Sequence, residues 1–140
     1  MFLLDTNVVS EIRKIAAGRA NPSLERWARG LDGTAAFVSV VTLHELEHGV
    51  LLAERRDPDG AGPLRQWLDV DVSDAFADRI LGIDQTIATI AASLHVPDPA
   101  PINDAYIAAT ALAHKLTMAT HNVADFNRFS GFKVVNPWDS

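Results

Sequence analysis

The sequence predicts an α/β fold in which helices pack on a parallel β-sheet. Short apolar runs alternate along the chain with stretches of helical spacing, which is the pattern of strand–helix–strand units. The 140 residues are 48% hydrophobic and 21% charged, which are ordinary values for a globular protein. We therefore expect one domain, residues 1–140, long enough to bury a core without disulfide bridges or a structural metal.

Five short apolar runs are the candidate strands, at residues 2–4, 35–40, 79–83, 116–120 and 132–135. The first run ends in an informative way, because Asp5, Thr6 and Asn7 follow it directly. These three residue types cap helix N-termini, and a helix is expected next. The carboxyl end of a buried parallel strand is also where open α/β sheets bind their ligands. Both interpretations of Asp5 are open at this point.

Helices are expected between these runs, at residues 8–14, 23–31, 43–56, 64–70, 84–96 and 104–115. The third of them has apolar residues at the spacing of one helical face: Leu43, Leu46, Val50 and Ala53. Thr42 is expected to open that helix and Asp104 to open the last one, because both residue types are good N-caps. Residues 57–63 and 97–101 are expected to be loops.

Composition excludes several kinds of protein and site. The chain has no cysteine, so it has no disulfide, no thiolate metal site and no thiol nucleophile. Its formal net charge of −6 argues against a general nucleic-acid-binding protein, because neutralising phosphates takes a basic surface. That charge is compatible with an enzyme that binds phosphates through a divalent cation. We find no signal peptide and no apolar run of the ~18 residues that a membrane span needs, so we expect a soluble protein.

One short motif points to a different chemistry. Residues 44–48, HELEH, match the pattern in which two zinc-peptidase histidines share a zinc ion beside a glutamate base. The pattern lacks a third ligand, because Leu51 and Glu54 stand where longer zinc-peptidase motifs have Gly and His, and no glutamate follows Glu54. An aspartate ligand remains open. The alternative is that His44 and His48 are partly exposed residues on a helix surface.

Oxygen-bearing side chains from four segments fall at one edge of the predicted sheet. They are Asp5 after the first strand, Glu45 in the helix after the second, Asp104 before the fourth, and Asn122 and Asp125 after the fourth. Strand ends and the starts of the following helices meet at the same edge of a parallel sheet. Close carboxylates repel unless a cation neutralises them, and all-oxygen ligands suit Mg²⁺ or Mn²⁺. Taken singly, each acid also has an ordinary alternative as a helix cap or surface residue.

The chain resembles a known family through the strings FLLDTNVVSE, VSVVTLHELEHGV, NDAYIAATALAHKLTMATHNVADF and VVNPW. In this order and at these spacings they resemble the PIN-domain ribonucleases of the VapC toxin type, and most closely the FitB-like subgroup. The resemblance runs nearly end to end. It implies a three-layer α/β/α sandwich around a parallel five-stranded sheet of order 3-2-1-4-5. It also implies the toxin of a type II toxin–antitoxin system, a Mg²⁺- or Mn²⁺-dependent endoribonuclease inhibited by a cognate VapB-type antitoxin.

The resemblance also assigns roles to residues. The catalytic set that it implies is Asp5, Glu45, Asp104, Asn122 and Asp125. The first three would hold the metal. The family's fourth acidic position falls on Asn122, which offers an oxygen but no charge, so Asp125 is a second candidate for that role. Thr6 and Thr120 match hydroxyl positions that hold a metal-bound water or an acid in place.

The implied reaction is hydrolysis, in which an activated water attacks an RNA phosphodiester in line. We expect an RNA substrate, with tRNA and mRNA both open, and a homodimer that joins its antitoxin in a larger complex. We expect the cytoplasm and no membrane. Two other functions stay open: a catalytically silent PIN-fold binding partner, for which Asn122 is the only support in the sequence, and the HELEH zinc peptidase.

Overall fold

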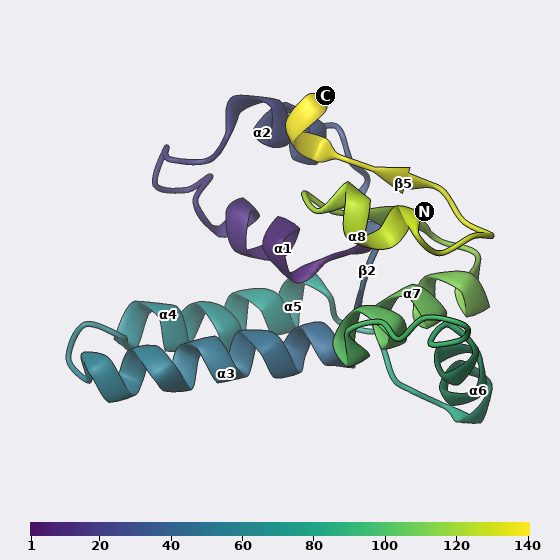
Figure 1. The fold of residues 1–140 in the computed structure, drawn as a ribbon. Helices are drawn as coiled ribbons and strands as arrows, with labels where there is room; N and C mark the ends of the chain where they lie inside the picture. The colour runs from purple at the N-terminus through teal and green to yellow at the C-terminus, as the bar shows by residue number, and fades with distance from the viewer.

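The strands form one parallel sheet of five members with the order β3-β2-β1-β4-β5, as the resemblance implied. The computed structural model describes all 140 residues (Figure 1). The strands are β1 (Phe2–Leu4), β2 (Ala36–Ser39), β3 (Ile80–Leu81), β4 (Thr117–Ala119) and β5 (Val134–Val135). β1 lies in the middle, where Phe2 pairs with Ala36 of β2 and with Thr117 of β4.

Helices occupy most of the chain between the strands. They are α1 (Thr6–Arg13), α2 (Pro22–Arg29), α3 (Val40–Arg56), α4 (Gly62–Gln66), α5 (Ser73–Ala75), α6 (Gln85–Ser93), α7 (Ile102–His114) and α8 (Val123–Asn127). Three further turns are η1 (Gly33–Ala35), the π-helical η2 (Trp67–Val72) and η3 (Pro137–Asp139). No helix is long and apolar enough to cross a lipid bilayer.

Alternation along the strands creates a core on each face of the sheet, because successive strand side chains point to opposite faces. Leu4 and Ala119 belong to a core with α1, α2, α3 and η2, whereas their neighbours Leu3 and Met118 belong to a core with α7 and α8. α6 adds to the second side by packing on α7 through Ile87 and Ala91. The result is the predicted three-layer α/β/α arrangement.

Two predicted helix starts are wrong. α3 begins at Val40 rather than after Thr42, because Ser39 at the end of β2 accepts a hydrogen bond from the Val41 N–H at 3.0 Å. α7 begins at Ile102 after Pro101, whose carbonyl accepts the first helical hydrogen bond. Asp104 therefore lies within the first turn of α7 and is not its N-cap.

Other boundaries also differ from prediction. β3 has two residues instead of five, because its partner β2 turns into α3 after Ser39 and leaves no backbone to pair with. The helix expected at 64–70 is split into α4 and the π-helical η2. The short helix α8, which follows β4, was not predicted.

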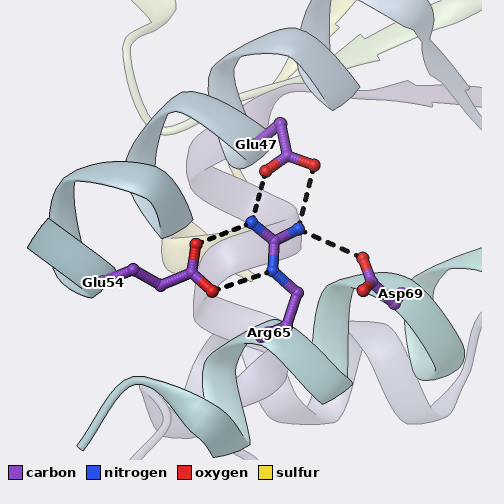
Figure 2. Close-up of polar contacts among 4 residues, drawn as sticks. All are labelled: Glu47, Glu54, Arg65 and Asp69. Atoms are coloured by element: carbon purple, nitrogen blue, oxygen red, sulfur yellow. Dashed lines mark hydrogen bonds and ion pairs between the residues drawn. The ribbon is translucent and has the colours of Figure 1, made fainter. Parts of the chain in front are cut away.

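α3 extends beyond the sheet, with α4 beside it in the view of Figure 1. Arg65 joins the two helices, as Figure 2 shows. Its guanidinium donates two hydrogen bonds to Glu47, at 2.6 and 2.9 Å, and two to Glu54, at 2.9 and 3.2 Å. A fifth contact, at 3.3 Å, reaches Asp69 in η2. Because each glutamate accepts a bidentate, charge-assisted pair, Arg65 holds the pKa of both below their ordinary value.

Candidate active site

Four acidic side chains lie near one another where the strands end. Asp5 follows β1 directly, Glu45 lies in the second turn of α3, Asp104 in the first turn of α7, and Asp125 in α8 just after β4. All the strands run in the same direction, so these positions share the carboxyl edge of the sheet. The structure therefore brings together acids from four segments, as the sequence predicted.

Asp5 is the buried member of this group, with a relative exposure of 6%. Its Oδ1 accepts the backbone N–H of Thr6 at 2.9 Å. Its Oδ2 accepts the Thr120 hydroxyl at 2.7 Å and the Asn7 side-chain amide at 3.1 Å. Burial raises the pKa of Asp5 above its ordinary value, although these donors favour the charged form, and the nearby charge of Glu45 raises the pKa further. Asp5 thus contributes to the start of α1 while its second oxygen is held by donors outside the helix.

Glu45 is oriented by hydroxyl and amide groups. The Thr6 hydroxyl donates to Glu45 Oε1 at 2.6 Å, and Thr6 Oγ1 lies 3.2 Å from Thr42 Oγ1. The Asn103 side-chain amide donates to Glu45 Oε2 at 3.4 Å. A single residue, Thr6, therefore links the first strand's end to the acid of α3.

Asp104 differs from the other two because its carboxylate accepts no hydrogen bond within the protein, and no Lys or Arg pairs with any of the four acids. It is half-buried. Burial, followed by the negative charges of Asp5, Asp125 and Glu45, raises the pKa of Asp104 to about 6. Its negative charge is thus unfavourable in the protein alone, and a bound cation would relieve it.

Two side chains, Thr120 after β4 and Asn7 after β1, hold Asp5 in place. Thr120 is fully buried, and its hydroxyl also accepts the backbone N–H of Asn122 at 3.0 Å. Asn7 bridges the ends of β1 and β4: its amide lies 3.4 Å from Thr120 Oγ1, and its Oδ1 accepts the His121 N–H at 3.1 Å. These bonds fix the carboxylate of Asp5 relative to β4.

The donor set fits a hard, hydrated divalent cation. It consists of carboxylate, hydroxyl and amide oxygens, the ligands that Mg²⁺ and Mn²⁺ prefer. No three His, Cys, Asp or Glu side chains form a ready-made metal site. Mg²⁺ tolerates that arrangement, because it usually keeps several waters and binds through one or two carboxylates.

The HELEH motif does not form a zinc site in this arrangement. His44 and His48 are exposed on α3 with ring centroids 6.5 Å apart, and no third ligand completes a group with them. Glu45 accepts its hydrogen bonds from Thr6 and Asn103 instead.

Comparison with known proteins agrees with this geometry. The chain matches the PIN domain over residues 2–131. The chain belongs to the PIN-domain family.

This PIN domain has similar relatives along its whole length. It is 34% identical to the toxin FitB of Neisseria gonorrhoeae over 99% of both chains. It is 31% identical to the VapC ribonuclease Y4jK of Sinorhizobium fredii, again over 99% of both. Among solved structures it is similar to FitAcB from Neisseria gonorrhoeae, with a TM-score of 0.88, 32% identity and complete coverage of both chains.

The predicted site residues differ in how they are connected to one another. Asp5, Thr6, Glu45 and Thr120 are connected by direct hydrogen bonds, and Asp104 and Asp125 lie close enough to interact by charge. Asn122 joins the group only through its backbone N–H, and its exposed side chain makes no hydrogen bond.

Three residues of this arrangement were not singled out from the sequence as site residues. Asn7 and Asn103 donate hydrogen bonds to the acids, and Thr42 contacts the Thr6 hydroxyl. Asn7 was noted only as a possible cap. The signal available for it was its place two residues after Asp5, and for Asn103 its place beside Asp104.

Proposed function

We propose that this PIN domain is the toxin of a type II toxin–antitoxin system and acts as an endoribonuclease that hydrolyses RNA phosphodiester bonds. One observation carries the proposal. Asp104 is a half-buried carboxylate beside three other acids, and no basic side chain and no hydrogen-bond donor of the protein pairs with it. The relatives called toxin FitB and VapC ribonuclease Y4jK support the choice of activity and role. The RNA substrate sets the cytoplasm as the place of action.

Mg²⁺ or Mn²⁺ is the proposed cofactor, held by Asp5, Glu45 and Asp104 directly or through water. When bound, the cation supplies charge stabilisation on the phosphate and lowers the pKa of water. The chain supplies the positioning: Thr120 and Asn7 fix Asp5, and Thr6 fixes Glu45.

Asp125 is the proposed fourth acid in place of Asn122. Its carboxylate is exposed and close enough to Asp104 to raise the pKa of that residue. It is therefore free to accept the proton of the attacking water as the water oxygen joins phosphorus and one P–O bond breaks. Asn122 keeps a structural role through its N–H bond to Thr120.

The proposed partners are a cognate VapB-type antitoxin and a second copy of this chain. The family resemblance supports both, and a similar relative bears the name toxin. An antitoxin that covers the acidic edge of the sheet would block access of RNA to the carboxylates.

The experiment that tests this function is cleavage of a mixed tRNA and mRNA panel by the purified protein. Cleavage is expected with Mg²⁺ or Mn²⁺, should stop in EDTA and should return when the cation is restored. Glu45→Gln should abolish it, whereas His44→Ala and His48→Ala should leave most of it, because neither histidine contacts the acids.

Two results would contradict the proposal. Undiminished cleavage in metal-free buffer would refute the carboxylate site. A folded protein that binds antitoxin but cleaves no RNA in the panel, or in RNA mapped after induced expression, would favour the catalytically silent partner.

A further inference from the structure

A cavity of about 240 Å³ lies between α1 and α3, and Thr6 and Glu45 of the acidic edge are among its lining residues. Thr6 and Glu45 line one end of this inner cavity, and Arg13 at the end of α1 and the following Lys14 line it further along the helix. Leu64 and Trp67, from the α4–η2 segment, contribute the apolar wall. This inner cavity therefore leads from a proposed metal-binding carboxylate to basic side chains.

A second, outer cavity of about 280 Å³ continues the first. The two share Arg13 and Leu64, and the outer one adds Arg56 and Asp57 at the end of α3. Glu45 and Arg56 are eleven residues apart on one helix, a separation of ~16 Å along its axis. Arg56 is thus too far away to contact a phosphate that lies at the acids, but it can contact one further along the strand.

The arginines of this passage are available to bind an anion. Neither Arg13 nor Arg56 takes part in an ion pair or a side-chain hydrogen bond, whereas Lys14 is paired with Glu11 at 3.0 Å. The Arg13 guanidinium lies over the Trp67 ring, 5.8 Å from its centroid. Stacking of this kind orients a guanidinium and leaves its N–H edge free for a phosphate.

We propose that Arg13 and Arg56 bind backbone phosphates of the RNA strand on one side of the bond that is cut. The inference rests on the proposed ribonuclease function and adds the path of the substrate. In a chain of net charge −6, two unpaired arginines along one passage supply the local positive charge that an RNA strand needs. The acids at its end receive the phosphodiester, and Arg13 and Arg56 hold the strand that leads to them.

The test measures binding of a short, fluorescently labelled single-stranded RNA in EDTA, so that no cleavage occurs. Arg13→Ala and Arg56→Ala should each weaken binding about tenfold. Each should also reduce the dependence of log affinity on log salt concentration by about 0.7, the value for one phosphate contact to a single strand. Arg13→Lys should lose part of the affinity, because lysine keeps the charge without the planar fork.

Arg55→Ala and Arg19→Ala are the matched controls, since both arginines are exposed and line neither cavity. They should bind as wild type does. In Mg²⁺, Arg13→Ala should raise KM for RNA cleavage about tenfold while kcat stays within about twofold, as expected for loss of substrate binding.

Wild-type affinity and salt dependence in folded Arg13→Ala and Arg56→Ala would overturn the proposal. So would variants that lose affinity only for the antitoxin, because the passage would then be a protein-docking surface. A wild-type protein that neither binds nor cuts RNA would refute the ribonuclease function itself, a result distinct from loss confined to the two arginine variants.

Discussion

The molecule contains two acidic clusters with opposite electrostatic conditions. Glu47, Glu54 and Asp69 surround Arg65, which we call the Arg65 cluster, and the pKa of each of its glutamates lies below the ordinary value. The open cluster, at the carboxyl edge of the sheet, consists of Asp5, Glu45, Asp104 and Asp125. It has no basic partner, and the pKa values of Asp5 and Asp104 are raised above their ordinary values. The first cluster is complete within the protein, whereas the second lacks a positive charge.

The same helix supplies both clusters. Glu45 and Glu47 are two residues apart on α3, which places them roughly 200° apart around the helix axis. Glu45 therefore reaches the open cluster, whereas Glu47 reaches Arg65 on α4. Acidic residues on one helix therefore differ in whether the protein itself neutralises their charge, and only the open cluster leaves charge for a cation to neutralise.

The largest expected effect separates the clusters by activity. Asp104→Asn should lower RNA cleavage roughly a hundredfold or more, because it removes a charge from the open cluster. Asp69→Asn, the same substitution in the Arg65 cluster, should leave kcat/KM unchanged. Steady-state cleavage by both variants is the measurement. Equal losses of cleavage in the two variants would mean that the open cluster is no more important for the reaction than the Arg65 cluster.

The next effect concerns how the open cluster is held. Thr120→Val removes the hydroxyl that donates to Asp5 at 2.7 Å and is expected to cost about 1.5–3 kcal/mol of unfolding free energy. Cleavage should fall about 10- to 100-fold, since a supporting bond to a proposed ligand is lost. Denaturant unfolding and cleavage assays measure the two effects. Thr120→Ser, which keeps the hydroxyl, should restore most of both, and failure to do so would assign the loss to packing of the methyl group.

A smaller effect is expected in the Arg65 cluster. Arg65→Gln leaves three acids without their cation, so the melting temperature should fall by a few degrees, and less at high salt because the groups are partly exposed. Cleavage per folded molecule should persist. Thermal melts at low and high salt, followed by cleavage assays below the transition, are the measurements. An inactive but folded variant would show that the cluster serves the reaction.

The smallest effect is the response of the metal-free protein to pH. The raised pKa of Asp104 means that the folded state binds the proton more tightly, so its ionisation opposes folding above about pH 6 and this penalty disappears as the pH falls toward 3.8. The lowered pKa values of Glu47 and Glu54 have the opposite sign: their contribution is present above pH 4.5 and is lost below it.

Metal-free Asp104→Asn should therefore melt at or above wild type at pH 7, and the difference should vanish near pH 4. Added Mg²⁺ should raise the melting temperature of wild type more than that of the variant. Melts in EDTA and in Mg²⁺ across this pH range measure both. A variant that melts below wild type at pH 7 in EDTA would contradict the idea that Asp104 is repelled by its neighbours.

The sequence was most informative where structure follows from local pattern. Apolar runs located all five strands. Acids at strand ends and at helix starts located the open cluster. Helix starts were less predictable, because Ser39 and Pro101 begin their helices earlier than Thr42 and Asp104 suggested. The strand order came from the family resemblance, since alternation alone does not fix which strands are neighbours.

Contacts between distant segments were beyond prediction. Arg65 and Glu47 are 18 residues apart, and they meet only because α4 folds back along α3. Asn7 joins Thr120 across 113 residues, and nothing in its local sequence distinguishes such an amide from a helix cap. HELEH shows the reverse case, since a familiar local pattern lacks the third ligand that only tertiary structure could supply.

The position of β4 beside the central strand β1 has a consequence for the synthesis of this protein. Asp5 leaves the ribosome early, yet its carboxylate is held by Thr120 and its backbone N–H by Ala119, more than a hundred residues later. A nascent chain, or one cut short by a premature stop codon before β4, lacks the strand that borders β1 and the hydroxyl that holds Asp5. The arrangement of side chains around Asp5 can therefore be complete only after translation has passed Thr120, near the end of the chain.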